Sequence, residues 1–104
     1  MANGRDVQEI KRIRNELLVA LKVVYPAALQ AEHMLRSLLV LFPTLEFEQI
    51  RRDCHYLTAK GYIERVATDR EGDADLTPWR RRWFRLTATG VELADRCIHD
   101  PAMD

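Results

Sequence analysis

The chain has few of the side chains on which catalytic and metal sites are usually built. Its 104 residues include three histidines and two cysteines, and no CxxC, HExxH, P-loop or GxSxG pattern occurs among them. Cys54 and His55 are neighbours, but on a helix their side chains would point roughly 100° apart, so they do not make a pair. The sequence therefore predicts neither an enzyme nor a cofactor or metal site.

Long apolar runs are also missing. No stretch approaches the roughly 20 apolar residues that cross a bilayer. No apolar segment follows the basic residues of the N-terminal MANGRDVQEIKR, as a secretory signal would require. We therefore expect a cytoplasmic protein without membrane contact, in which Cys54 and Cys97 stay reduced. Both thiols are expected to be buried as small apolar groups.

Net charge is absent, but local charge is not. Sixteen basic and sixteen acidic residues cancel, yet DREGDAD (69–75) carries four acids against one base, and TPWRRRWFR (77–85) carries four arginines and no acid. A local basic patch can bind nucleic acid, although a pI of about 6.8 argues against strong nonspecific affinity. The length fits one domain, and we expect it to span 1–104 with a core from about 6 to 98 and short tails.

Apolar periodicity predicts a long first helix from about 6 to 25. Its apolar stripe is formed by Val7, Ile10, Ile13, Leu17, Leu21 and Val24. Asp6 is the expected N-cap, and Pro26 ends the helix because the residue before a proline is pushed toward extended geometry. Coiled-coil-like spacing predicts a homodimer through this helix, with a seam of Ile10, Ile13, Leu17, Ala20 and Val24.

Two further helices are expected in the middle of the chain. An extended connector at 27–30 leads into a helix at about 31–41, which Pro43 ends. Thr44 is the expected cap of a third helix, and Gly61 lies where a helix C-terminal glycine is expected. The inner side of this third helix is predicted to consist of Phe47, Ile50, Cys54 and Leu57.

After Gly61 the apolar period changes from helical to alternating. YIERVA (62–67) and RWFRL (82–86) are predicted to be antiparallel strands joined by a long polar hairpin loop. Thr87 or Thr89 is expected to cap a last helix, GVELADRCI (90–98), that turns Cys97 and Ile98 inward. The expected core comprises Leu17, Leu21, Leu35, Leu38, Ile50, Leu57, Ile63, Phe84 and Leu86.

This order, with IRRDCHYLTAKGYIERV followed by WFRLTATGVELAD, resembles the winged helix-turn-helix superfamily over about 13–98. YLTAKGYIE looks like the end of that family's recognition helix, and RLTATG looks like the close of its wing. The resemblance implies an α+β, mostly helical fold with a long N-terminal helix, a two-stranded wing and a C-terminal helix. The ending GVELADRCIHDPAMD is also similar, more weakly, to small winged-helix proteins of Mu-like prophages.

The resemblance implies that the third helix and the wing bind double-stranded DNA, as in a sequence-specific transcriptional regulator. The residues placed to do so are Gln49, Arg51, Arg52, His55, Tyr56, Arg80, Arg81 and Arg82. Arginine and glutamine read guanine and adenine edges, and the wing arginines suit phosphates. Trp79 and Trp83 are expected either to stack on a base or sugar or to bridge the wing to the core.

Two alternatives remain open on the sequence. Arg81 or Arg85 could simply pair with acids of the loop, namely Asp69, Asp73 and Asp75. Glu46 and Glu48, expected in the first turn of the third helix, would face phosphates unfavourably. They either restrict the site to a cytosine contact at Glu48 or favour a protein partner. The alternative function is therefore a winged-helix protein-interaction module that does not bind DNA.

Overall fold

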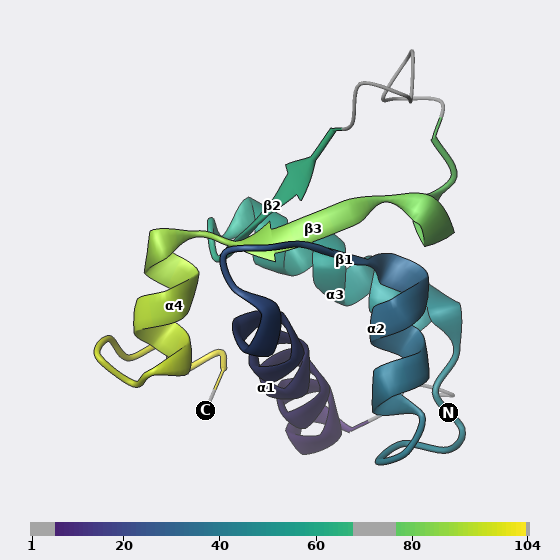
Figure 1. Cartoon of the computed structure of the whole chain (residues 1–104). Coiled ribbons are helices and arrows are strands. Elements are labelled where there is room, and N and C mark those ends of the chain that lie inside the picture. The colour runs from purple at the N-terminus through teal and green to yellow at the C-terminus, as the bar shows by residue number, and fades with distance from the viewer. Residues whose placement is uncertain (1–5, 68–76, 104) are drawn as a thin grey trace.

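The computed structural model describes residues 6–67 and 77–103, which form four α-helices, a short 3-10 helix and an antiparallel sheet (Figure 1). In chain order the elements are α1 (Val7–Val24), β1 (Leu29–Gln30), α2 (Ala31–Leu38), α3 (Phe47–Ala59), β2 (Ile63–Val66), η2 (Trp79–Arg81), β3 (Trp83–Leu86) and α4 (Ala88–Ala94). The predicted α+β class is confirmed. Every helix in this part of the chain is too short or too polar to cross a membrane.

The sheet has three strands in the order β1-β3-β2. Antiparallel pairing of β2 with β3 was expected, and the register places Ile63 opposite Leu86. The connector before α2 forms the third strand, because Leu29 lies opposite Phe84. Figure 1 shows the sheet crossing above α1, with α4 at one end of β3 and η2 with α2 at the other. Most of the expected hairpin loop, 68–76, lies outside the described residues.

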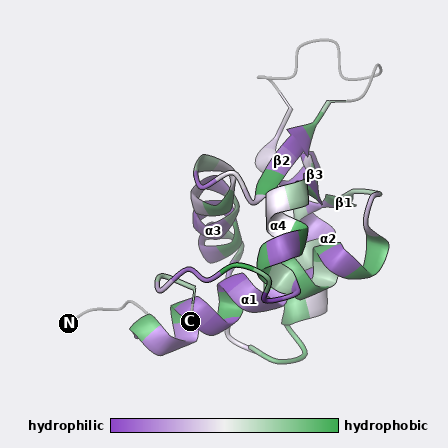
Figure 2. Ribbon diagram, turned by 90° about the vertical axis from the view of Figure 1, so that its left-hand side faces the viewer, coloured by the Kyte–Doolittle hydropathy of each residue, from purple (hydrophilic) through white to green (hydrophobic). Residues whose placement is uncertain are grey.

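Local capping and periodicity explain α1. The Asp6 carboxylate accepts a hydrogen bond from the amide of Glu9 at 2.9 Å, as an N-cap does. Figure 2 shows apolar and polar segments alternating along the helix, as one buried stripe requires. The buried residues of the stripe are Ile13, Leu17, Leu18 and Leu21.

The prediction that Ile13 and Leu17 form part of a dimer interface on α1 is wrong. Both are fully buried in the core of the single chain, so neither is available to a second copy. The apolar side chains that α1 does expose in its C-terminal half are Val19 and Val23. A dimer through the expected seam is therefore not part of the function proposed below.

The third helix begins later than expected, because the segment before it is part of the core. Leu45 is buried in the core, the helix starts at Phe47, and Glu46 takes the N-cap position without a side-chain hydrogen bond. At the other end Gly61 adopts φ +83°. The amide of Tyr62 donates a hydrogen bond to the carbonyl of Leu57, and the amide of Gly61 donates one to the carbonyl of Thr58, both at 3.0 Å. This pair of hydrogen bonds forms a Schellman cap.

The last helix ends earlier than expected, with a Schellman cap of its own. The amide of Cys97 donates a hydrogen bond to the carbonyl of Glu92 at 2.7 Å, and the amide of Arg96 donates one to the carbonyl of Leu93 at 3.0 Å. Arg96 takes the left-handed position at φ 62°. Because the chain turns away at this point, Cys97 and Ile98 are exposed, and their expected burial is wrong.

The expectation for the other thiol is confirmed. Cys54 is fully buried on the inner side of α3, and burial raises its pKa to about 12. Its thiol therefore stays protonated at neutral pH and acts as a small apolar group.

The C-terminal segment is part of the core, so the expected short tail after 98 is wrong. Met103 is 1% exposed, and its carbonyl accepts a hydrogen bond from the side-chain amide of Asn15. The buried Asp100 accepts hydrogen bonds from the Tyr62 hydroxyl at 2.5 Å and from the amide of Ala102 at 2.9 Å. The first of these raises the pKa of Tyr62 to about 12 and lowers the pKa of Asp100.

The expected core is confirmed with one exception. Eight of the nine expected residues are buried, whereas Leu35 is half-buried and packs against the others. The buried residues outside that expectation include Leu18, Ala31, Leu45, Tyr62, Leu93 and Met103. Several of these belong to the caps and the C-terminal segment, where no apolar period marks them.

Gly90 permits the closest approach of α4 to the sheet. A Cβ at this position would lie 2.0 Å from the carbonyl oxygen of Tyr62, a backbone atom that cannot turn aside. We expect Gly90→Ala to lower the free energy of unfolding by about 3 kcal/mol or more, as for severe overpacking. Gly61→Ala meets no atom within 4 Å and should cost only about 1 kcal/mol for its left-handed backbone. Urea denaturation measures both, and a smaller loss for Gly90→Ala than for Gly61→Ala would contradict this packing.

Candidate nucleic-acid interface

The solvent side of α3 carries three of the five side chains of this helix that were expected to touch DNA. Arg52 and His55 are exposed, and Arg51 is partly exposed. All three lie away from the buried side of the helix, which is formed by Ile50, Asp53, Cys54 and Leu57. The side chain of Arg52 is 71% exposed, which makes it the most accessible cation of this helix.

The carboxylate of Glu48 forms ion pairs with both arginines of this surface and offsets part of their positive charge. Arg51 donates from Nε to Glu48 Oε1 at 3.0 Å and from an Nη to the other carboxylate oxygen. Arg52 Nε lies 3.5 Å from Glu48 Oε2. The hydrogen bonds from Arg51 are the main cause of the lowered pKa of Glu48. Two cations and one anion therefore leave a single positive charge on this turn of the helix.

Gln49 and Tyr56 lie on a different side of α3, where the helix meets α1. Gln49 Nε2 donates to Asp53 Oδ2 at 3.0 Å, and Arg14 Nε of α1 donates to Asp53 Oδ1 at 3.2 Å. The guanidinium of Arg14 also lies 3.8 Å from the centre of the Tyr56 ring. These contacts join the two helices, so both residues support the position of α3 instead of sharing its open side.

Asp53 is the residue of this cluster that sequence reasoning missed. It is 1% exposed, and burial raises its pKa although hydrogen bonds from Gln49 and Arg14 act in the opposite direction. Its position three residues after Ile50 and four before Leu57 places it on the inner side of the helix. A polar residue at such a position signals a buried partner, but the sequence does not identify Arg14 as that partner.

The three consecutive arginines in η2 and at its C-terminal end lie in different surroundings. The guanidinium carbon of Arg80 lies 4.4 Å from the centre of the Phe47 ring. Arg82 lies 4.5 Å over the ring of Trp79 and donates from Nε to the carbonyl of Thr77 at 2.9 Å. Arg81 is exposed. Arg80 is exposed as well, whereas Arg82 is half-buried, so Arg80 and Arg81 are the two that a partner in solution can reach.

The neighbouring aromatic and charged residues bear on two alternatives that the sequence leaves open. Trp79 stacks on Phe84 with ring centres 5.7 Å apart, so it joins η2 to the core. Arg85 pairs with Glu64 of the adjacent strand at 2.7 Å. The loop acids expected as alternative partners, Asp69, Asp73 and Asp75, lie outside the described residues.

The contact of Arg80 with Phe47 brings η2 to the start of α3. Phe47 is the first residue of that helix, and Arg51 follows one turn later on nearly the same side. Arg80 and Arg51, which come from two separate segments, therefore both lie near the Phe47 ring, and Arg81 and Arg52 are their neighbours in the sequence. We call Arg51, Arg52, Arg80 and Arg81 the arginine surface.

The buried Asp53 makes stability depend on pH. Its pKa is raised above the ordinary 3.8, so the folded chain binds its proton more readily than the unfolded chain does. This contribution to stability is present at acid pH and is lost as the pH rises from about 3.8 through the folded pKa. Asp53→Asn cannot ionise, so the stability of this variant relative to the original chain should increase with pH over that interval. Urea denaturation at several pH values measures it, and a constant or falling difference would contradict the assignment.

Comparisons of the chain with protein-family models, with curated proteins and with solved structures find no match. The architecture is therefore described by its own geometry, as a small α+β fold with four helices and a three-stranded antiparallel sheet in the described residues. A fold by itself does not determine a function, so a function for this chain has to be proposed from the chemistry of its surfaces.

Proposed function

We propose that this protein binds double-stranded DNA in a sequence-specific manner, as a small transcriptional regulator, through the arginine surface. The observation that carries the proposal is the contact between Arg80 and the ring of Phe47 at 4.4 Å. It joins η2 to the N-terminal end of α3, so that arginines from both segments can reach one duplex. A cytoplasmic location, expected from the sequence, is consistent with such a role.

The two segments would make different kinds of contact. The N-terminal half of a recognition helix enters the major groove in helix-turn-helix docking, and Arg52 has the exposure needed to reach a base edge there. The fork of an arginine pairs with the O6 and N7 atoms of guanine. Arg81, exposed beside β3, suits a phosphate oxygen, which fixes the register of the protein without reading sequence.

The remaining expected contacts have supporting roles in this proposal. Gln49 and Tyr56 hold α3 on α1 through Asp53 and Arg14. The ring contact of Arg80 fixes η2, although the donors at the edge of its guanidinium can still meet a phosphate. His55 lies on the open side of α3, one turn after Arg51.

One observation favours the alternative of a protein-interaction module without DNA binding. Glu48 pairs with both arginines of α3, which lowers the positive charge available for phosphates. The two functions differ in their response to salt, because neutralising phosphates releases counterions and makes DNA affinity fall steeply with ionic strength. Titration of mixed-sequence duplex DNA at several salt concentrations therefore separates the two.

Arg81→Ala should weaken binding to every duplex by a similar factor, because a phosphate contact carries no sequence information. The slope of log K against log salt should become shallower by about 1, since the variant neutralises one phosphate fewer. Arg52→Ala should instead cost about 1 to 3 kcal/mol at a preferred site and little at other sequences. Fluorescence anisotropy with labelled duplexes measures both quantities.

A matched control is Arg36→Ala, which removes the same charge from an exposed residue. Arg36 lies near the C-terminal end of α2, which is the end away from the sheet. This variant should leave affinity and salt slope unchanged. If Arg81→Ala behaves like this control and the original chain shows no salt-dependent binding, the DNA proposal fails and the protein-interaction module takes its place.

Glu48→Gln should strengthen DNA binding. The substitution removes the carboxylate that holds Arg51 and Arg52 in the unbound protein and that would repel phosphates in the complex. An exposed ion pair is weak, so we expect a gain of roughly two- to fivefold in affinity at low salt. Glu92→Gln, the same change at an exposed position of α4, is the control and should have no effect. Weaker binding of Glu48→Gln at every sequence would show that Glu48 supports the contact instead of opposing it.

A further inference from the structure

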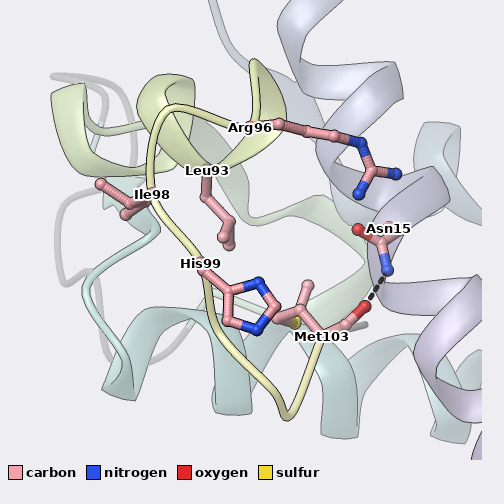
Figure 3. A pocket seen from close by; sticks show the side chains of 6 residues that line it. All are labelled: Asn15, Leu93, Arg96, Ile98, His99 and Met103. Carbon is pink, nitrogen blue, oxygen red and sulfur yellow. Dashed lines mark hydrogen bonds between the residues drawn. The ribbon is translucent and has the colours of Figure 1, made fainter.

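A cavity of about 430 Å³ lies between α1, α4 and the C-terminal segment. Its volume is within the range of small-molecule sites. The residues that line it are Asn15, Leu93, Arg96, Ile98, His99 and Met103 (Figure 3). Its lining includes α4 and the segment after it, which lie at one end of β3, whereas η2, which carries Arg80 and Arg81, lies at the other end (Figure 1). The cavity is thus separate from the surface proposed to bind DNA.

The lining combines an apolar wall with a few polar groups, as ligand sites do. Leu93, Ile98 and Met103 supply the apolar wall. The polar groups are the Arg96 guanidinium, which Figure 3 shows extended toward Asn15, the side-chain amide of Asn15, and the imidazole of His99. A ligand that fits this lining has an apolar body and an anionic end.

Arg96 occupies a backbone position that its residue type does not favour. Among the described residues it is the only non-glycine residue with a positive φ, at 62°. The cap of α3 has the same hydrogen-bond pattern and places Gly61 at the equivalent position, where glycine is the usual residue. A strained position that retains a long charged side chain directed into a cavity is a reason to look for a ligand.

Asn15 defines a second polar contact. Its side-chain nitrogen donates to the carbonyls of Lys11 and Met103, which uses both hydrogens of the amide. The hydrogen bonds hold the residue in place on α1. Its oxygen remains as an acceptor on the side of the cavity that Arg96 approaches (Figure 3).

We propose that this cavity binds a small organic carboxylate. The planar fork of Arg96 pairs with a carboxylate, Asn15 Oδ1 accepts a hydrogen bond from a hydroxyl or amine on the ligand, and the apolar wall covers the hydrocarbon body. An inorganic phosphate would leave that wall without a partner, so it fits the cavity less well. The inference does not depend on DNA binding.

A simpler role for Arg96 is a cation at the C-terminal end of α4, where the helix dipole favours positive charge. That role needs no ligand and predicts a loss of stability on removal of the side chain. The carboxylate proposal predicts the opposite, because Arg96→Gly relieves the left-handed backbone while it removes the group that binds.

The experiment titrates the full chain with benzoate, hexanoate, 4-methylpentanoate and indole-3-acetate, observed by NMR of the backbone amides. At least one carboxylate should give saturable shifts at 93–99 and at Asn15, with a dissociation constant below about 1 mM, equivalent to about −4 kcal/mol. The amide of that compound and inorganic phosphate should bind at least tenfold more weakly. Arg96→Gly should raise the melting temperature by roughly 2 to 6 °C and weaken carboxylate binding at least tenfold.

Arg36→Ala removes an exposed arginine elsewhere and should leave both readouts unchanged, which controls for net charge. Any one of three results would overturn the proposal: no saturable shift at the cavity with any of the four carboxylates, equal binding of the neutral amide or of phosphate, or unchanged carboxylate binding by Arg96→Gly. A melting temperature lowered by Arg96→Gly, together with unchanged binding, would assign Arg96 to the helix dipole.

Discussion

The contact between the start of α4 and the backbone of Tyr62 is the constraint on which the rest of the fold depends. The carbonyl of Tyr62 accepts a hydrogen bond from the amide of Thr87 at 3.1 Å and lies against Gly90, where no side chain fits. The amide of the same residue closes the cap of α3 on Leu57, and its hydroxyl donates to Asp100. One residue therefore fixes where α3 ends and where α4 and the C-terminal segment lie. The cavity and the arginine surface are both positioned by elements that meet here.

The arginine surface combines contacts of unequal strength. Arg80 lies over the ring of Phe47, and a cation–π contact of this kind tolerates salt better than an exposed ion pair does, since part of its energy comes from packing. Glu48, by contrast, pairs with Arg51 and Arg52 in solvent, where ion pairs are weak and screened. In the proposed complex a phosphate would replace Glu48 while η2 remains on α3. This difference would let a chain of zero net charge offer a local basic surface to DNA.

Local chemistry was sufficient to predict most elements of this fold from the sequence. Asp6, Gly61 and Thr87 mark helix ends because a cap is made with neighbours three to five residues away. The site was predictable only in outline, because the contacts that arrange it span the chain. Asp53 meets Arg14 across 39 positions, and no period or cap encodes that pair. The buried Met103 was missed for the same reason, since a single apolar residue in a short irregular segment carries no periodic signal.

The two Schellman caps show how far backbone geometry determines sequence in this protein. Both helices end with the same pair of hydrogen bonds, and both need a left-handed residue at the same place. At α3 the residue is glycine, which adopts that conformation without steric cost. At α4 it is Arg96, although the backbone would be better served by glycine. Since the hydrogen bonds are alike, the backbone cannot account for the difference between the two caps. Departures of this kind are expected where a side chain has a function, and the proposed carboxylate site would give the guanidinium of Arg96 such a function.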